Sequence, residues 1–168
     1  MPKGTIVKAI SGYYYVRPDE RPSDVVQCRA RGVFKVKGVT PLVGDRVVFD
    51  TTASGEGTVL EVLPRTHELT RPPVANADTA VLVFSVAHPD LNLHLLDKML
   101  VHVERAGMDA VLGFSKIDLV DEPPREEMAI YERIGYPVVA TSVRTGEGIA
   151  ELARCLSGRT AILAGQSG

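Results

Sequence analysis

Two short polar segments in the second half of the chain carry side chains suited to recognising a purine base. The first is Ser-Lys-Ile-Asp at 115–118, and the second is Thr-Ser-Val-Arg-Thr-Gly at 141–146. A carboxylate such as that of Asp118 accepts two hydrogen bonds side by side, and guanine offers a matching pair of donors at N1–H and N2–H. Adenine lacks this pair, so a site built around the carboxylate would leave the charge unpaired and would reject adenine.

The residues around this aspartate add further contacts to the same base. The apolar stem of Lys116 can lie along the base plane while its ammonium stays in water. The Ser142 hydroxyl can brace its own loop, and the Val143 backbone N–H can point at guanine O6. Either segment alone could be an ordinary polar loop, but two of them after successive predicted strands favour guanine binding. The predicted base site comprises Ser115, Lys116, Ile117, Asp118, Ser142 and Val143.

Alternating strands and helices are predicted to hold both segments at one edge of a parallel sheet. The apolar runs that predict strands are 79–86, 109–114, 137–141 and 160–165. The segments that predict helices between them are 92–107, 123–135 and 146–157. Strand–helix–strand units of this kind form right-handed crossovers, and ligands bind where the strands end. The loops expected to matter therefore follow Val86, Phe114, Ala140 and Ala164.

The last four residues follow the fourth predicted strand and begin a phosphate-binding pattern. They match the first positions of the P-loop sequence Gly-x-x-x-x-Gly-Lys-Ser/Thr. The predicted partial P-loop consists of Gly165, Gln166, Ser167 and Gly168. In most GTPases this loop precedes the base-binding segments, whereas here it follows them. This order indicates a circular permutation, which a compact domain tolerates because its termini usually lie close together.

The first part of the chain is predicted to form a small β-barrel. Short runs rich in Val, Ile and aromatic residues alternate with turn sequences over residues 1–71, without sustained helical periodicity. Four or five strands in this length favour an OB-type barrel, with an SH3-like barrel as the alternative. Pro72 and Pro73 stiffen the chain that follows. We therefore expect a linker at 72–77 and a partial GTPase-like α/β domain at 78–168.

Charged and aromatic residues are unevenly distributed between the two parts. Residues 1–71 hold 11 Lys and Arg against 8 Asp and Glu, whereas residues 72–168 hold 8 against 13. Barrels of this kind often bind nucleic acid through aromatic and basic side chains. Candidate RNA-binding residues, at alternate positions that could share one strand face, are Arg29, Arg31, Lys35 and Lys37. Tyr13 and Tyr15 also share a face, and the residues alone leave open whether they bind bases or lie in the core.

Composition and cysteine content narrow the classes of protein that fit. The 168 residues are 45% hydrophobic and 24% charged, and the longest apolar runs are far too short to cross a bilayer. Cys28 and Cys155 lie in different kinds of segment, which argues against a disulfide framework and suits a reducing cytoplasm. The four histidines form no metal-ligand motif, so we expect no metal site in this part of the protein.

With the barrel first, then the two polar segments and then the partial P-loop, the sequence resembles a known family. That family is the circularly permuted GTPases of small-ribosomal-subunit biogenesis, RsgA/YjeQ. The resemblance covers the barrel and the stretches NADTAVLVFSVAHPDLNLHLLDKMLV, SKIDLV, TSVRTGEGI and TAILAGQSG. It implies an OB domain, a permuted GTPase domain and a C-terminal zinc domain. It also implies that the protein binds GTP or GDP with Mg²⁺ and hydrolyses GTP during late maturation of the small ribosomal subunit. The implied partners are that subunit and its rRNA, for a cytoplasmic monomer that does not contact membranes.

The sequence departs from the family pattern in two places. Ser115 stands where the family commonly has Asn or Thr, which bears on affinity for the base rather than on base choice. The 168 residues end inside the P-loop pattern, so we expect an N-terminal portion without the P-loop Lys, the switch segments or the zinc domain. We expect no catalytic residue in this portion and no GTP hydrolysis by it alone. The alternative is a non-enzymatic RNA- or ribosome-binding module that keeps a GTPase-like scaffold.

Overall fold

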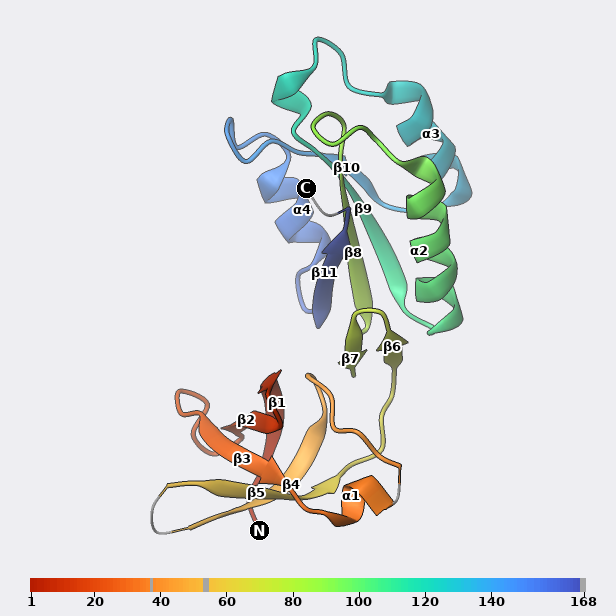
Figure 1. The fold of residues 1–168 in the computed structure, drawn as a ribbon. Coiled ribbons are helices and arrows are strands. Elements are labelled where there is room, and N and C mark those ends of the chain that lie inside the picture. The colour runs from red at the N-terminus through yellow and green to blue at the C-terminus, as the bar shows by residue number, and fades with distance from the viewer. Residues whose placement is uncertain (37, 53–54, 167–168) are drawn as a thin grey trace. The chain divides into compact units, whose positions relative to one another are not determined.

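The computed structural model describes residues 1–36, 38–52 and 55–166, which fall into two compact units. The first unit is Met1–Asn76 and the second is Ala77–Gly168. The first contains the β-barrel and a small hairpin, and the second contains an α/β sheet (Figure 1).

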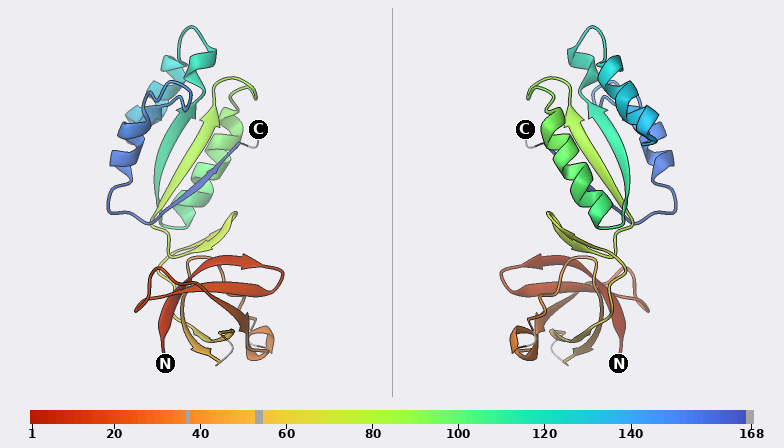
Figure 2. Two further views of the ribbon diagram at one scale, coloured as in Figure 1. Left: turned by 90° about the vertical axis from the view of Figure 1, so that its left-hand side faces the viewer. Right: turned by 90° about the vertical axis from the view of Figure 1, so that its right-hand side faces the viewer.

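Five strands of the first unit close into a barrel in the order β1-β2-β3-β5-β4. Figure 2 shows this barrel from two sides. The strands are β1 Lys3–Ile10, β2 Tyr13–Pro18, β3 Val26–Ala30, β4 Arg46–Thr51 and β5 Gly57–Val62. β3 and β5 pair in parallel, and the other neighbouring strands pair antiparallel. A short helix, α1 (Val33–Val36), lies between β3 and β4 in the chain. This topology confirms the OB-type barrel and excludes the SH3-like alternative.

Apolar side chains at alternating strand positions fill the barrel. The buried cluster is Ile6, Val16, Cys28, Phe34, Val47, Phe49 and Val59. Tyr14 packs against this cluster, so Tyr13 and Tyr15 belong to the opposite face of β2. The hypothesis that Tyr13 and Tyr15 lie in the core is therefore wrong, because strand alternation gives that position to Tyr14.

One of the short runs that predict barrel strands, residues 25–35, is interrupted by a helical turn. β3 ends at Ala30, where its pairing with β5 also ends, and α1 follows. The turn brings Phe34 into the barrel core, where its side chain is only 7% exposed. Burial of this ring favours the helical turn over a longer strand, since β2 begins at Tyr13, opposite Arg29, and would offer a longer β3 no partner on that side.

A two-stranded hairpin occupies most of the segment predicted to be a linker. β6 (Glu68–Thr70) pairs antiparallel with β7 (Pro73–Ala75). The Ala75 N–H donates to the Val43 carbonyl at 2.9 Å, so the hairpin belongs to the first unit. The prolines that suggested a linker lie at the hairpin turn and at the start of an edge strand, positions where a missing N–H is tolerated.

The second unit contains a four-stranded parallel sheet in the order β10-β9-β8-β11. Its strands are β8 Thr79–Ser85, β9 Asp109–Ser115, β10 Val138–Ala140 and β11 Ala161–Gly165. Its helices are α2 Leu93–Arg105, α3 Arg125–Ile134 and α4 Ile149–Cys155, with a 3-10 turn, η1, at Ile117–Leu119. Figure 1 shows α2 and α3 on one side of the sheet and α4 on the other. The predicted alternation of four strands and three helices is confirmed.

Helix α2 illustrates how local sequence sets these elements. The Asn92 side chain accepts a hydrogen bond from the Leu95 N–H at 2.9 Å and so caps the first turn. Leu96, Leu100 and Val103 are buried at helical spacing against the sheet. In the described part of the chain, none of the helices is both long and apolar enough to cross a membrane.

Candidate functional site

The two segments predicted to bind a base lie side by side where β9 and β10 end. The Thr141 N–H donates to the Phe114 carbonyl at 2.7 Å, and the Ile117 N–H donates to the Thr141 carbonyl at 3.3 Å. Ile117 is buried, and Ser115 closes β9 with its carbonyl accepting a hydrogen bond from the Val86 N–H at 2.9 Å. Parallel pairing of β9 and β10 therefore brings together residues that are more than 20 positions apart in sequence.

Asp118 is the almost buried carboxylate at the centre of this site, with a side chain 11% exposed. Its Oδ1 accepts a hydrogen bond from the Ser142 hydroxyl at 2.6 Å. Ser142 is fully buried, and its oxygen accepts in turn from the Thr145 N–H at 3.1 Å. The second oxygen, Oδ2, lies 3.9 Å from the Nε of the exposed Arg144. The buried Ser142 hydroxyl thus fixes one oxygen of the Asp118 carboxylate. The other oxygen, Oδ2, lies on the side of the exposed Arg144.

The loop that carries Ser142 is held by its own backbone. The Ser142 N–H donates to the Glu147 carbonyl at 3.0 Å, and the Gly146 N–H donates to the Ser142 carbonyl at 2.9 Å. Gly148 has a φ of 71°, and a Cβ there would lie 1.9 Å from the Ala140 carbonyl oxygen. Only glycine fits this position without moving β10 or the loop. These contacts hold the loop against β10, where it carries the buried hydroxyl.

Val143 lies at the tip of this loop with 88% of its surface exposed. Its backbone N–H has no acceptor among the residues that the structure describes. A free N–H beside Asp118 suits the role predicted for it, which is donation to an acceptor on the base edge.

Lys116 links its own segment to the loop after β8, and its ammonium lies at an exposed position. Lys116 adopts a left-handed backbone conformation with a φ of 62°, and its ammonium donates to the His88 carbonyl. This bond joins the loop after β8 to the candidate site. Ser85 donates to the Pro89 carbonyl at 2.6 Å, and Gln166 Nε2 donates to the Asp90 carbonyl at 2.7 Å.

The sequence indicated that the loop after β8 would reach the same sheet edge, but it did not identify residues 88–90 as part of the site. Their contribution is made by backbone carbonyls, which carry no signature in side-chain type. Only the position of the loop after a buried strand could have pointed to it.

The start of the predicted P-loop follows β11 closely. A Cβ on Gly165 would lie 1.9 Å from the Val83 carbonyl oxygen, so glycine is required where β11 runs beside β8. The Gln166 N–H donates to the same carbonyl at 3.3 Å. The Gln166 side-chain oxygen is buried without a hydrogen-bond partner among the described residues. Residues 167–168, the rest of the predicted partial P-loop, lie outside the described residues.

Of the four basic residues predicted to bind RNA, the three that the structure describes do not share one strand face. Arg29 lies in β3 and Arg31 just beyond it, and both are exposed. Lys35 lies in α1, so the period-two argument that grouped it with the arginines is wrong. Lys37 lies outside the described residues. The structure instead places Arg29 against Tyr13, with the guanidinium carbon 4.8 Å from the ring centroid.

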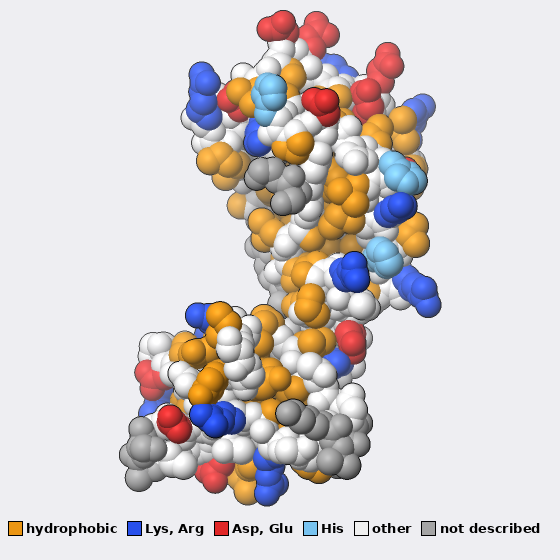
Figure 3. Space-filling view, in the orientation of Figure 1, with side chains coloured by type: hydrophobic (Ala, Val, Ile, Leu, Met, Phe, Trp, Pro, Cys, Tyr) orange, Lys and Arg blue, Asp and Glu red, His pale blue; other side chains and the backbone are white. Residues whose placement is uncertain are grey.

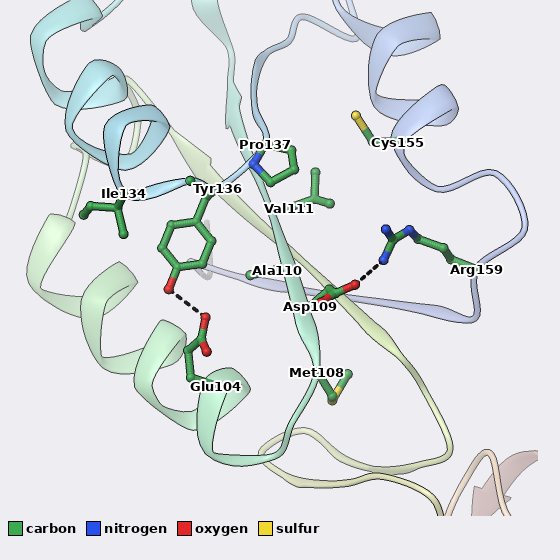
Figure 4. A pocket seen from close by; sticks show the side chains of 11 residues that line it. Glu104, Met108, Asp109, Ala110, Val111, Ile134, Tyr136, Pro137, Cys155 and Arg159 are labelled. Atoms are coloured by element: carbon green, nitrogen blue, oxygen red, sulfur yellow. Dashed lines mark hydrogen bonds and ion pairs between the residues drawn. The ribbon is translucent and has the colours of Figure 1, made fainter.

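A hollow of about 700 Å³ lies at the other end of β9, where the strand begins (Figure 4). Tyr136 donates to Glu104 at 2.8 Å, and Arg159 donates to Asp109 at 2.6 Å. Burial, together with the bond to Glu104, raises the pKa of Tyr136, and the bond to Asp109 raises the pKa of Arg159. These polar groups are already paired with one another, so the candidate site remains at the carboxyl ends of the strands.

A parallel α/β sheet whose predicted base-binding loops precede its glycine turn has the arrangement expected of a circularly permuted GTPase domain. Two solved structures share the architecture. YloQ, described as a circularly permuted GTPase, is 41% identical with a TM-score of 0.76, and the match covers 100% of this chain and 61% of that one. YjeQ from Thermotoga maritima is 35% identical with a TM-score of 0.82, and the match covers 99% of this chain and 61% of that one.

The family models give the same result. Residues 3–59 match the RsgA N-terminal domain and residues 62–168 match the RsgA GTPase domain, so the chain belongs to the RsgA GTPase family. The small ribosomal subunit biogenesis GTPase RsgA of Geobacillus kaustophilus (strain HTA426) is 51% identical over 172 residues. That match covers 100% of this chain, which spans 58% of the length of the relative.

Proposed function

We propose that this chain supplies the base-binding part of a GTP hydrolase that acts in maturation of the small ribosomal subunit. The observation that carries the proposal is the geometry of Asp118, an almost buried carboxylate held by the Ser142 hydroxyl at 2.6 Å where two parallel strands end. Membership of the RsgA GTPase family supports the same conclusion. The relatives named for small ribosomal subunit biogenesis supply the proposed biological context.

In this proposal the base is recognised by charge and hydrogen bonding together. Guanine N1–H and N2–H donate to Asp118, and the Val143 N–H donates to O6. Arg144, which faces Asp118 Oδ2 across 3.9 Å, gives way to these donors when the base enters. Adenine offers no pair of donors at this edge and would leave the carboxylate desolvated and unpaired, which costs about 1–3 kcal/mol or more.

The phosphates of the nucleotide are proposed to lie beside the turn that begins at Gly165. Backbone N–H groups in a glycine turn after a strand bind phosphate oxygens, and Mg²⁺ neutralises phosphate charge during transfer. The Gln166 side-chain oxygen, which is buried without a partner among the described residues, lies at this turn and would suit a polar group beside it. The described residues of the turn offer peptide groups rather than carboxylates, so they fit the phosphates better than the metal ion.

The barrel is proposed to contact the rRNA of the small subunit. Arg29 and Arg31 are exposed there, and Lys35 and Lys37 follow closely in sequence. The α/β unit offers a less suitable surface near its base site. Figure 3 shows Asp and Glu side chains gathered at its edge, above η1 and the start of α3, where exposed acids include Asp121, Glu122 and Glu126. Carboxylates at this edge would repel RNA phosphates.

The test is the nucleotide preference of the Asp118→Asn variant of the intact protein. Asn presents one donor and one acceptor, so it matches xanthine, whose C2 carbonyl replaces the guanine amino group. We expect GDP affinity to fall by about tenfold or more and affinity for xanthosine diphosphate to rise. Asp121→Asn removes a neighbouring exposed acid and is the matched control, with GDP affinity unchanged. Unchanged GDP affinity in Asp118→Asn would refute the assignment.

A further inference from the structure

The outer face of the barrel carries two aromatic rings, each paired with a cation. The guanidinium of Arg29 lies 4.8 Å from the Tyr13 ring centroid, and the Lys8 ammonium lies 5.1 Å from the Tyr15 ring centroid. Arg29 also donates to the Tyr13 hydroxyl at 2.5 Å. Both rings are partly exposed, and both cations are exposed. This stacked face, comprising Lys8, Tyr13, Tyr15 and Arg29, has no role in the barrel core.

Strand pairing fixes the spacing of the stacked face. Lys8 pairs with Tyr15 across β1 and β2, and Tyr13 pairs with Arg29 across β2 and β3. Tyr13 and Tyr15 are two residues apart on β2, so their side chains emerge from one face about 6.6 Å apart. The two ring-and-cation pairs therefore repeat along β2 at a distance that one extended nucleotide step can span.

A hollow of about 530 Å³ adjoins this face at the end of β3. Arg29 lines it together with Arg31, Tyr14 and Phe34. Arg29 thus belongs both to the stacked face and to the hollow, and Arg31 adds a second positive charge beside it. The surface continues from two aromatic rings to a pair of arginines within the first unit.

We propose that the stacked face binds single-stranded RNA, with two consecutive unpaired bases stacked at Tyr13 and Tyr15. Lys8, Arg29 and Arg31 contact the phosphates of the same strand. An A-form duplex exposes phosphates and 2′-hydroxyls but keeps its bases stacked inside, so partly exposed tyrosines would gain little from it. A surface with basic residues alone would bind single-stranded and duplex RNA alike. The exposed tyrosine rings are what favour the single strand, because they can stack on unpaired bases. This inference deepens the proposal that the barrel contacts rRNA, and it rests on that proposal.

The test measures binding of fluorescein-labelled RNA to the 168-residue chain by fluorescence anisotropy. One ligand is an unstructured single strand of about 12 nucleotides, within the span that one such barrel covers, and the other is a duplex of the same length. Tyr13→Ala and Tyr15→Ala should each weaken single-strand binding by about tenfold, since one stacked base is lost. Tyr13→Phe keeps the ring and should keep most of the affinity. Arg21→Ala removes an exposed barrel charge that pairs with Asp24 outside the stacked face, and it should change affinity less than twofold.

The outcomes separate the two proposals. Single-strand binding that falls in both alanine variants and survives in Tyr13→Phe supports stacking. If the alanine variants, folded by circular dichroism, bind the single strand as tightly as the wild type, the stacking inference is wrong. If the alanine variants also bind the duplex as tightly as the wild type does, the basic residues contact phosphates only, and the proposed contact with rRNA stands. If neither RNA binds, both the inference and the rRNA contact are overturned.

Discussion

At the scale of single residues, the site depends on how one carboxylate is oriented. The sequence identified Asp118 and Ser142 separately, the first by the donors it could accept and the second as a brace for its loop. The structure shows that the Ser142 hydroxyl donates a hydrogen bond to the Asp118 carboxylate itself, with 2.6 Å between the two oxygens. Residue type predicted which hydrogen bonds each side chain could make. The contact between Asp118 and Ser142, however, depends on the pairing of β9 with β10. That contact could not be derived from spacing along the chain.

Ser142→Ala is expected to weaken guanine nucleotide binding by about tenfold in the intact protein, because Asp118 loses a charge-assisted hydrogen bond and the Thr145 N–H loses its acceptor. Isothermal titration with GDP measures the effect. Ser157→Ala, at an exposed position beyond α4, is the matched control and should bind GDP like the wild type. Equal affinities for the two variants would mean that the hydroxyl does not position Asp118.

At the scale of elements, the parallel sheet was predictable and parts of the barrel unit were not. β8 is a continuous apolar run and α2 repeats Leu96, Leu100 and Val103 at helical spacing, so periodicity alone defines both. α1 is only four residues long and forms because Phe34 enters the core, a tertiary effect that no local pattern contains. The β6–β7 hairpin was missed because its prolines resemble those of a linker.

Gly148→Ala should disrupt the loop that carries Ser142 more than Gly146→Ala does. Both glycines have positive φ, 71° and 81°, so alanine costs about 1–2 kcal/mol of backbone strain at either position. A Cβ at Gly148 would also collide with the Ala140 carbonyl, whereas a Cβ at Gly146 meets nothing within 4 Å. Hydrogen exchange across residues 141–148 should therefore rise further in Gly148→Ala. Equal exchange in the two variants would show that the close approach to β10 does not hold the loop.

At the scale of the whole molecule, two units of different chemistry share one chain. The barrel unit carries exposed arginines and ring-and-cation pairs, and the α/β unit carries the candidate base site and an acidic edge. The charge difference between the two parts of the sequence predicted this separation. The order of the predicted base-binding segments and the glycine turn indicated a permuted domain, and membership of the RsgA GTPase family agrees with it.

The central claim is that the loops after β9 and β10 recognise guanine, and an NMR titration of the ¹⁵N-labelled 168-residue chain tests it most directly. The chain is 18.1 kDa, a size at which backbone amides can be followed one by one. Guanosine monophosphate should shift the amides of residues 116–119 and 142–145 and leave those of the barrel unchanged. Adenosine monophosphate at the same concentration should leave residues 116–119 and 142–145 unshifted. Equal shifts with both nucleotides, or shifts confined to other parts of the chain, would contradict the assignment of Asp118 as the residue that selects guanine.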